Sequence, residues 1–424
     1  MNSQLLDPKE VYDVAVRFRE VEKLIERSGS TEQYARAIPV LRELVIESPN
    51  ALFLHNTLGM CLLRSGDAGS AITVLERAVE IDPQHKPTRL LLADALLSGG
   101  RIDSALAEFE SIVWLDEQDV DVRLRFAEAL QRVGRTDGAA EQCRRAIELA
   151  PDRAGPHARL CGMLQDTKQL ATAVRNFHQF VNKHTGDPLS HLNLGSAYLR
   201  LKRRTEAVAQ FREAIRLKAD FGDAMINLGM TLVGMGDAKE ARTICRQALT
   251  VPGFDAQARY CIGRAFQADG RIKSAVSEYE KAVAVRPSYA TPVDELARHY
   301  VGQRRVADAV RVLRRGVEAD PRNVRLANSL GQILATCRDD SIRDGSQAVV
   351  HLERAAQLVG FRDVLILQNL AAAYAEVGEF DRAVETAQRA LALAESARNT
   401  AVAGKVRSQL DGYRRGRPYR DANL

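Results

Sequence analysis

The sequence of 424 residues predicts an all-α solenoid of about eleven stacked helix pairs, closed by one further helix. Two observations lead to this fold class. One alanine recurs at a constant step of 34 residues along most of the chain, as expected of a repeat array. The composition also suits closely packed helices, because aromatic residues are only 5% while hydrophobic residues make up 46%. We therefore expect the chain to fold throughout, with a core that grows by adding repeats.

The recurring alanine sets the register of each repeat. It occupies nine positions at steps of 34 residues and two more after steps of 39 and 35: Ala37, Ala71, Ala105, Ala139, Ala173, Ala207, Ala241, Ala275, Ala309, Ala348 and Ala383. Twelve residues earlier the side chain is small, as at Gly59, Gly195 and Gly229, and four residues later it is usually bulky, as at Leu75 and Phe211. This spacing forms one helical face. Each repeat should therefore hold two helices that approach closely at the small residue.

Glycine and proline mark the ends of these helices. Glycine stands five residues before the alanine in six repeats, where a first helix needs a left-handed cap: Gly66, Gly100, Gly134, Gly236, Gly270 and Gly378. Proline stands twelve residues after the alanine in five repeats: Pro49, Pro83, Pro151, Pro287 and Pro321. Because proline does not fit a helix interior, it ends the second helix. Each repeat thus reads as helix, tight turn, helix.

This pattern resembles the tetratricopeptide repeat family, and segments such as LGMCLLRSGDAGSAITVLERAVEIDP match it closely. The resemblance covers residues 18–394 and implies a right-handed superhelix whose first helices line a concave groove that binds peptides. We expect a helical segment over residues 1–17, the repeat array over 18–394 with an insertion at 335–347, and a capping helix with a basic tail over 395–424. The last residues, GRPYRDANL, are expected to fray.

Asparagines supply the first candidate peptide-binding residues. Asn193 and Asn227 stand fourteen residues before the alanine in consecutive repeats, and Asn369 has the same place in a later one. In the family this position faces the groove, and an asparagine amide both donates to and accepts from a peptide backbone. The pair resembles the asparagine ladder in the repeat domain of the transferase that attaches N-acetylglucosamine to Ser and Thr. Solvated helix asparagines are the alternative.

Arginines supply the second set of candidates for the groove. They stand at two positions of the repeat: Arg64, Arg132 and Arg200 at one, and Arg264 and Arg298 at the other. Guanidinium groups directed into a groove favour acidic peptides. The neighbouring acidic residues Asp94, Glu128 and Asp166 offer the alternative that the first set is paired within the protein.

Residues 298–325 are strongly basic, with eight arginines against three acidic residues. Phosphate attraction makes nucleic acid a partner to consider. However, Tyr300 is the one aromatic residue of this stretch, so no stacking platform is predicted and a solvated basic face is the favoured interpretation. The whole chain carries 60 basic and 55 acidic residues, which is no nucleic-acid signal.

No metal or cofactor site is expected from the sequence. The six cysteines show no paired spacing typical of zinc sites or disulfide frameworks, and we expect reduced, buried thiols. The sequence has neither the layout of a signal peptide nor a run of apolar residues long enough for a transmembrane helix, which favours a cytoplasmic protein.

The sequence therefore predicts a non-catalytic scaffold that binds extended peptides or helices in its groove and assembles a multiprotein complex. One alternative is an accessory or regulatory subunit of a separate enzyme, such as a glycosyltransferase or sulfotransferase. A weaker alternative is an RNA- or phosphate-associated factor that uses the arginine-rich later repeats. The partner is expected to be a protein or peptide, with a bias toward acidic ones, and self-association is left open.

Overall fold

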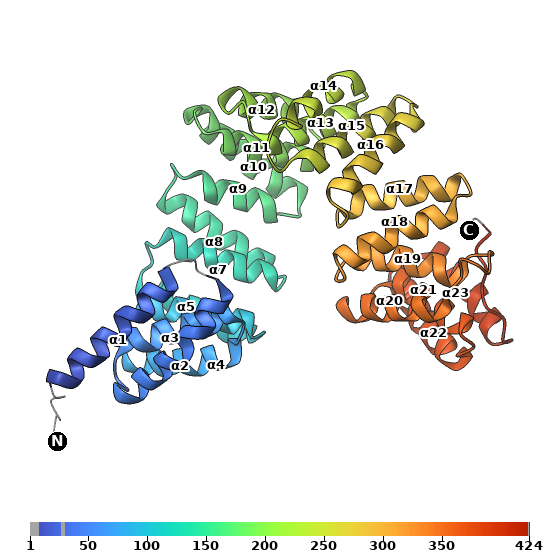
Figure 1. Cartoon of the computed structure of the whole chain (residues 1–424). Helices are drawn as coiled ribbons and strands as arrows, with labels where there is room; N and C mark the ends of the chain where they lie inside the picture. Colours follow the sequence, from blue (N-terminus) through green and yellow to red (C-terminus); the bar gives the residue numbers. More distant parts are fainter. Residues whose placement is uncertain (1–7, 27–29, 423) are drawn as a thin grey trace. The chain divides into compact units, whose positions relative to one another are not determined.

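The computed structural model describes residues 8–26, 30–422 and 424, and in these residues it contains helices and no strands. Residues 1–7 of the predicted N-terminal segment lie outside the described part. The chain forms two compact units, Met1–Thr185 and Gly186–Leu424. The first holds α1(Pro8–Glu26), α2(Thr31–Glu47), α3(Leu52–Ser65), α4(Ala68–Ile81), α5(Lys86–Ser98), α6(Ile102–Leu115), α7(Val120–Arg132), α8(Thr136–Leu149), α9(Ala154–Met163) and α10(Thr167–Lys183) (Figure 1).

The second unit continues the same succession of short helices. It holds α11(Pro188–Arg200), α12(Arg204–Leu217), α13(Gly222–Met235), α14(Ala238–Ala248), α15(Asp255–Ala268), α16(Ile272–Val285), α17(Ala290–Gly302), α18(Val306–Ala319), α19(Val324–Thr336), α20(Gly345–Leu358), α21(Val364–Glu376), α22(Phe380–Ser396) and α23(Thr400–Tyr413). The described residues thus form eleven helix pairs and one final helix, which confirms the predicted all-α array. The expected array boundary at residue 18 falls inside α1.

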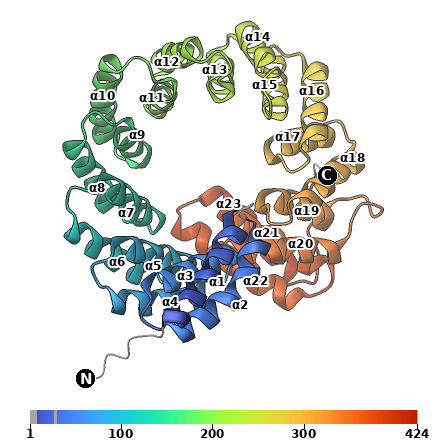
Figure 2. The same ribbon diagram turned by 60° about the vertical axis from the view of Figure 1, so that its left-hand side comes forward.

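Within each unit the first helices of the pairs lie along one side and the second helices along the other (Figure 2). Several successive first helices touch directly, as α11 touches α13 and α17 touches α19. We call the side of the second unit that is formed by α11, α13, α15, α17, α19 and α21 the first-helix face. Equivalent residues of neighbouring helices on this face are about 34 positions apart in the sequence. Each repeat therefore contributes one row of side chains to the face.

The recurring alanine is the centre of the contact inside each pair. Ten of the eleven alanines have no exposed surface, and Ala173 is 7% exposed. At Gly195 the contact is so close that an added Cβ would lie 2.5 Å from Cε1 of Phe211, the bulky residue of the same repeat. The predicted small and bulky positions therefore face each other, as the register requires.

The turns follow the predicted capping pattern. All six predicted glycines have positive φ, from 72° at Gly270 to 94° at Gly66. Two repeats reach the same left-handed conformation without glycine, at Lys202 with φ of 60° and at Arg304 with φ of 58°. Because a Cβ crowds the backbone there, these two turns are strained relative to the glycine turns.

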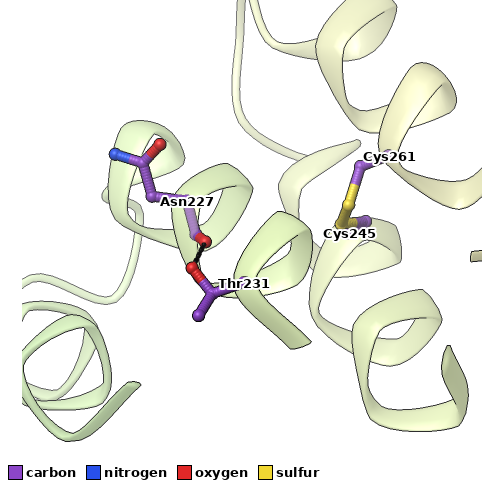
Figure 3. Close-up of a disulfide and its surroundings, with 4 residues drawn as sticks. All are labelled: Asn227, Thr231, Cys245 and Cys261. Carbon is purple, nitrogen blue, oxygen red and sulfur yellow. Dashed lines mark hydrogen bonds between the residues drawn. A yellow bond between two sulfur atoms is a disulfide. The ribbon is translucent and has the colours of Figure 1, made fainter. Parts of the chain in front are cut away.

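The expectation of six reduced thiols is wrong for one pair. Cys245 on α14 and Cys261 on α15 form a disulfide, with Cα atoms 6.1 Å apart (Figure 3). The cysteines are 16 residues apart in sequence and meet because the second helix of one repeat packs on the first helix of the next. Gly229 leaves room for both sulfur atoms. The other four cysteines are buried and form no disulfide, as predicted.

The final helix α23 covers α22, as a cap should. Its buried residues include Ala403, Val406 and Leu410. The predicted frayed end is wrong. Residues 417–422 and 424 turn back onto the second unit, where the main-chain N–H of Asp421 donates to the Thr336 carbonyl at 2.9 Å. This segment therefore belongs to the folded structure.

We expect Gly195→Ala to lower the free energy of unfolding by about 1–3 kcal/mol, because the new methyl group overlaps the Phe211 ring. Urea denaturation measures this change. The matched control is Gly234→Ala in α13, where the added Cβ meets only the Arg204 side chain, at 3.7 Å. Without a clash, better helix propensity should stabilise this control by up to ~1 kcal/mol. Equal effects in both variants would contradict the register.

Lys202→Gly should raise the free energy of unfolding by about 1 kcal/mol, because glycine adopts the positive φ of this turn without strain. The reciprocal change, Gly236→Lys, places a side chain at an equivalent turn with φ of 88° and should destabilise by a similar amount. Thermal melting of both variants measures the two shifts, which should have opposite signs.

Thiol titration of the denatured, unreduced protein should detect the four cysteines outside the disulfide and not the bridged pair. Reduction should raise the count to six and lower the melting temperature, because a bridge closing a loop of this size contributes roughly 3 kcal/mol. Six reactive thiols before reduction would show that the bridge is absent from the isolated protein.

Candidate functional site

Asn193 on α11 and Asn227 on α13 lie on neighbouring helices of the first-helix face. Both side chains are half-buried, and neither amide makes a hydrogen bond to any residue that the structure describes. The backbone carbonyl of Asn227 accepts from the Thr231 hydroxyl at 2.6 Å, while its side-chain amide points away from the disulfide (Figure 3). Two successive repeats thus offer an amide that the fold itself does not use.

The third predicted asparagine is engaged within the protein. The amide nitrogen of Asn369 donates to the side-chain oxygen of Asn328 on α19, at 3.0 Å. Sequence reasoning missed Asn328, because the insertion shifts the spacing in this repeat and Asn328 stands three residues before the small Gly331, whereas Asn369 stands two before Ala371. The structure brings these two asparagines together but does not leave Asn369 as a third open amide.

Arg64, Arg132 and Arg200 are exposed at the ends of α3, α7 and α11. Two of the acidic residues considered as their partners, Asp94 and Glu128, form ion pairs with other arginines instead. Arg125 donates to both oxygens of Asp94 at 2.5 and 2.6 Å, and Arg159 donates to Glu128 at 2.9 Å. Asp166 caps α10 by accepting from the N–H of Gln169. The ion pairs that do form link neighbouring first helices through Arg125 and Arg159, two arginines that were not among the predicted groove residues.

Arg264 and Arg298 have partners on the first-helix face. Arg264 is half-buried and donates to the Tyr260 hydroxyl at 3.0 Å, and this hydrogen bond raises the pKa of the guanidinium. Arg298 is exposed and forms an ion pair with Glu295 at 3.1 Å. These two arginines therefore offer less unpaired charge to a ligand than their positions in the sequence imply.

Half of the arginines in the basic stretch 298–325 also pair with acidic residues, namely Arg298, Arg305, Arg311 and Arg325. Tyr300 is buried, its ring is covered by Arg305 at 4.5 Å, and its hydroxyl donates to Glu280 at 2.7 Å. Burial raises the pKa of Tyr300 to about 12. A covered ring offers no surface on which a base could stack, which agrees with the interpretation of this stretch as a solvated basic face.

Neither a metal centre nor a membrane span is evident in the described part of the chain. No group of three or more His, Cys, Asp or Glu side chains there is arranged to hold a metal ion. No helix among the residues searched is both long enough and apolar enough to cross a membrane.

Solved structures that resemble this chain include three repeat proteins of low sequence identity. A tetratricopeptide repeat protein from Parabacteroides merdae has 11% identity, with 60% of this chain and 99% of that chain covered and a TM-score of 0.44. YrrB, a tetratricopeptide repeat protein with an unusual peptide-binding site, has 18% identity, with 44% and 96% covered and a TM-score of 0.34. The MamA protein has 18% identity, with 48% and 92% covered and a TM-score of 0.29.

No curated protein matches the chain. Family models do match it, and all of them describe the tetratricopeptide repeat. The matched residues are 30–86, 62–113, 90–154, 189–221, 222–251, 256–289, 295–337 and 366–401. Together they cover well over half of the sequence. The chain therefore belongs to the tetratricopeptide repeat family.

Proposed function

We propose that this chain is a non-catalytic scaffold that binds an extended peptide of a partner protein across α11 and α13. Its repeats support a role in protein–protein interaction, and a tetratricopeptide fold is typically non-catalytic. The observation that carries the finer proposal is the pair of unengaged amides at Asn193 and Asn227, at equivalent positions of two touching helices.

An extended peptide presents an N–H and a C=O at every residue, and each asparagine amide can satisfy one of each. Both amides are half-buried, so they lose little side-chain freedom and little solvation on binding. Contacts to the peptide backbone give affinity without demanding a particular ligand sequence. Specificity then has to come from neighbouring side chains of the same face.

Charge supplies one such preference. Arg200 is exposed at the end of α11, seven residues beyond Asn193 and therefore about two helix turns away. An exposed guanidinium group at this end of the helix favours acidic side chains in the ligand. We infer that acidic peptides bind more tightly than neutral ones and that salt weakens this preference.

The double variant Asn193→Ala with Asn227→Ala should weaken peptide binding by roughly 10- to 100-fold, because up to four hydrogen bonds to the ligand are lost. Suitable ligands are peptides selected from a random-sequence display library on the wild-type chain. Their affinities for the purified variants are then measured by isothermal titration calorimetry.

Gln247→Ala is the matched control, because it removes an exposed amide from α14, a second helix on the other side of the unit. It should bind as the wild type does, and all variants should melt at similar temperatures. Unchanged affinity in the asparagine double variant for every selected peptide would refute binding across α11 and α13.

A further inference from the structure

Residues 417–422 and 424, which we call the tail segment, follow a sharp reversal after α23. Gly416 has φ of 66°, and the N–H of Arg417 donates to the Gly412 carbonyl at 3.0 Å. This left-handed turn sends the chain away from the axis of α23. Figures 1 and 2 both show the end of the chain beside α17 to α19, although these helices lie far from it in the sequence.

The tail segment is bound by main-chain and side-chain contacts. The Asp421 N–H donates to the Thr336 carbonyl at 2.9 Å, and the Arg338 N–H donates to the Leu424 carbonyl at 3.4 Å. Arg420 pairs with Glu376 of α21 at 2.5 Å, and the half-buried Tyr419 packs on the core of the second unit. These are the kinds of contact by which an extended peptide is held on a folded surface.

The insertion in the tenth repeat exposes the main-chain groups to which this segment binds. In most repeats the chain turns directly from first to second helix, but here α19 ends at Thr336 and the extended Cys337 follows, with φ of −60° and ψ of 140°. Arg343 holds the inserted loop by donating to the Cys337 carbonyl at 2.9 Å and to Glu376 at 2.6 Å. The Thr336 carbonyl and the Arg338 N–H are thereby left for the tail segment.

The second helix of this repeat begins with a side-chain cap. Asp344 caps α20 by accepting from the N–H of Gln347 at 2.9 Å, and its own N–H donates to the Leu334 carbonyl at 2.9 Å. The five extra residues thus leave the helix pair intact and change only the edge between its helices. This division explains how an insertion is accommodated in an otherwise regular array.

The tail segment does not fill the surface on which it lies. Asp421 and Leu424 border a hollow of about 490 Å³ between α17 and α19, whose other lining residues include Arg298 and Arg325. On the other side, Ala422 and Leu424 border a hollow of about 780 Å³ beside the inserted loop, lined by Arg304, Arg305 and Arg338. Arginine side chains thus border the segment on both sides, and three of them, Arg298, Arg305 and Arg325, also pair with acidic residues of the helices.

We propose that the surface formed by α17, α19 and the inserted loop is a second peptide site, which the tail segment occupies and which a partner segment of the same chemistry enters by displacing it. The partner segment is extended and carries an aromatic residue, a basic residue and an acidic residue in succession, followed by a leucine three residues later. The tail segment then acts as a built-in competitor.

This proposal rests on the proposed function in assigning ligand binding to the first-helix face, but it uses different residues. Binding at each of the two sites can therefore be tested, and disproved, independently of the other. The asparagine double variant should leave the second site unchanged, because Asn193 and Asn227 lie on α11 and α13 while the tail segment contacts α19, the inserted loop and α21.

The test uses a labelled synthetic peptide, GRPYRDANL, and the full chain with Tyr419→Ala and Arg420→Ala. The substitutions weaken the attached segment, so the free peptide should bind the variant in fluorescence anisotropy at least ten times more tightly than it binds the wild type. The attached segment competes at an effective concentration on the order of millimolar. Arg415→Ala, an exposed arginine just before the reversal with no ion pair among the described residues, should behave as the wild type does.

A second peptide, N-methylated at the nitrogen equivalent to that of Asp421, lacks the donor for the Thr336 carbonyl and should bind at least tenfold more weakly than the first. Equal binding of the two peptides would overturn the proposal, as would the absence of binding to a folded variant at millimolar peptide. If the double variant does not fold, Arg420→Ala alone provides the same comparison, because that residue is part of an ion pair rather than of the core.

Discussion

The close contact between the two helices of each pair is the constraint on which the rest of this structure depends. A small residue on the first helix and a buried alanine on the second helix let the two helices approach. A bulky residue of the second helix, such as Phe211 beside Gly195, fills the remaining space. Because protein interiors are close-packed, the sizes of these side chains set the distance between the helices. Because the contact is repeated along the array, the first helices form one face, and each repeat leaves one row of its side chains on that face for contacts with neighbours or ligands.

Several polar side chains on this face bind other residues of the protein. Asp94 with Arg125 and Glu128 with Arg159 join successive first helices in the first unit, and Arg264 and Asn369 are bonded to neighbours in the second. Ion pairs at such exposure contribute little to stability, about 0–1 kcal/mol each, but they do occupy polar groups that a ligand would otherwise bind. Asn193 and Asn227 differ because their amides have no such neighbour among the described residues.

The departures from regular repetition carry the features that are particular to this chain. The inserted loop interrupts the turn after α19 and presents main-chain groups at its edge, and the tail segment lies against them. A regular repeat satisfies its own helix ends through a tight turn, so it has little to offer an extended strand at that point. The disulfide between Cys245 and Cys261 is a further departure, since it joins two repeats covalently.

The sequence by itself determined the fold class, the register, the helix pairs and the six glycine turns. It could do so because these features depend on side chains at short, regular spacings within one repeat, as at Gly66 and Ala71. The half-buried asparagines Asn193 and Asn227 were predicted as groove residues from their repeat position together with the resemblance to the family. Only the tertiary structure decided which polar groups meet between repeats. The bridge from Cys245 to Cys261, the bond from Asn369 to Asn328 and the docking of the tail segment all join residues whose separations are not multiples of the repeat. No periodic pattern encodes such contacts, because they arise from how neighbouring helices and loops pack in space.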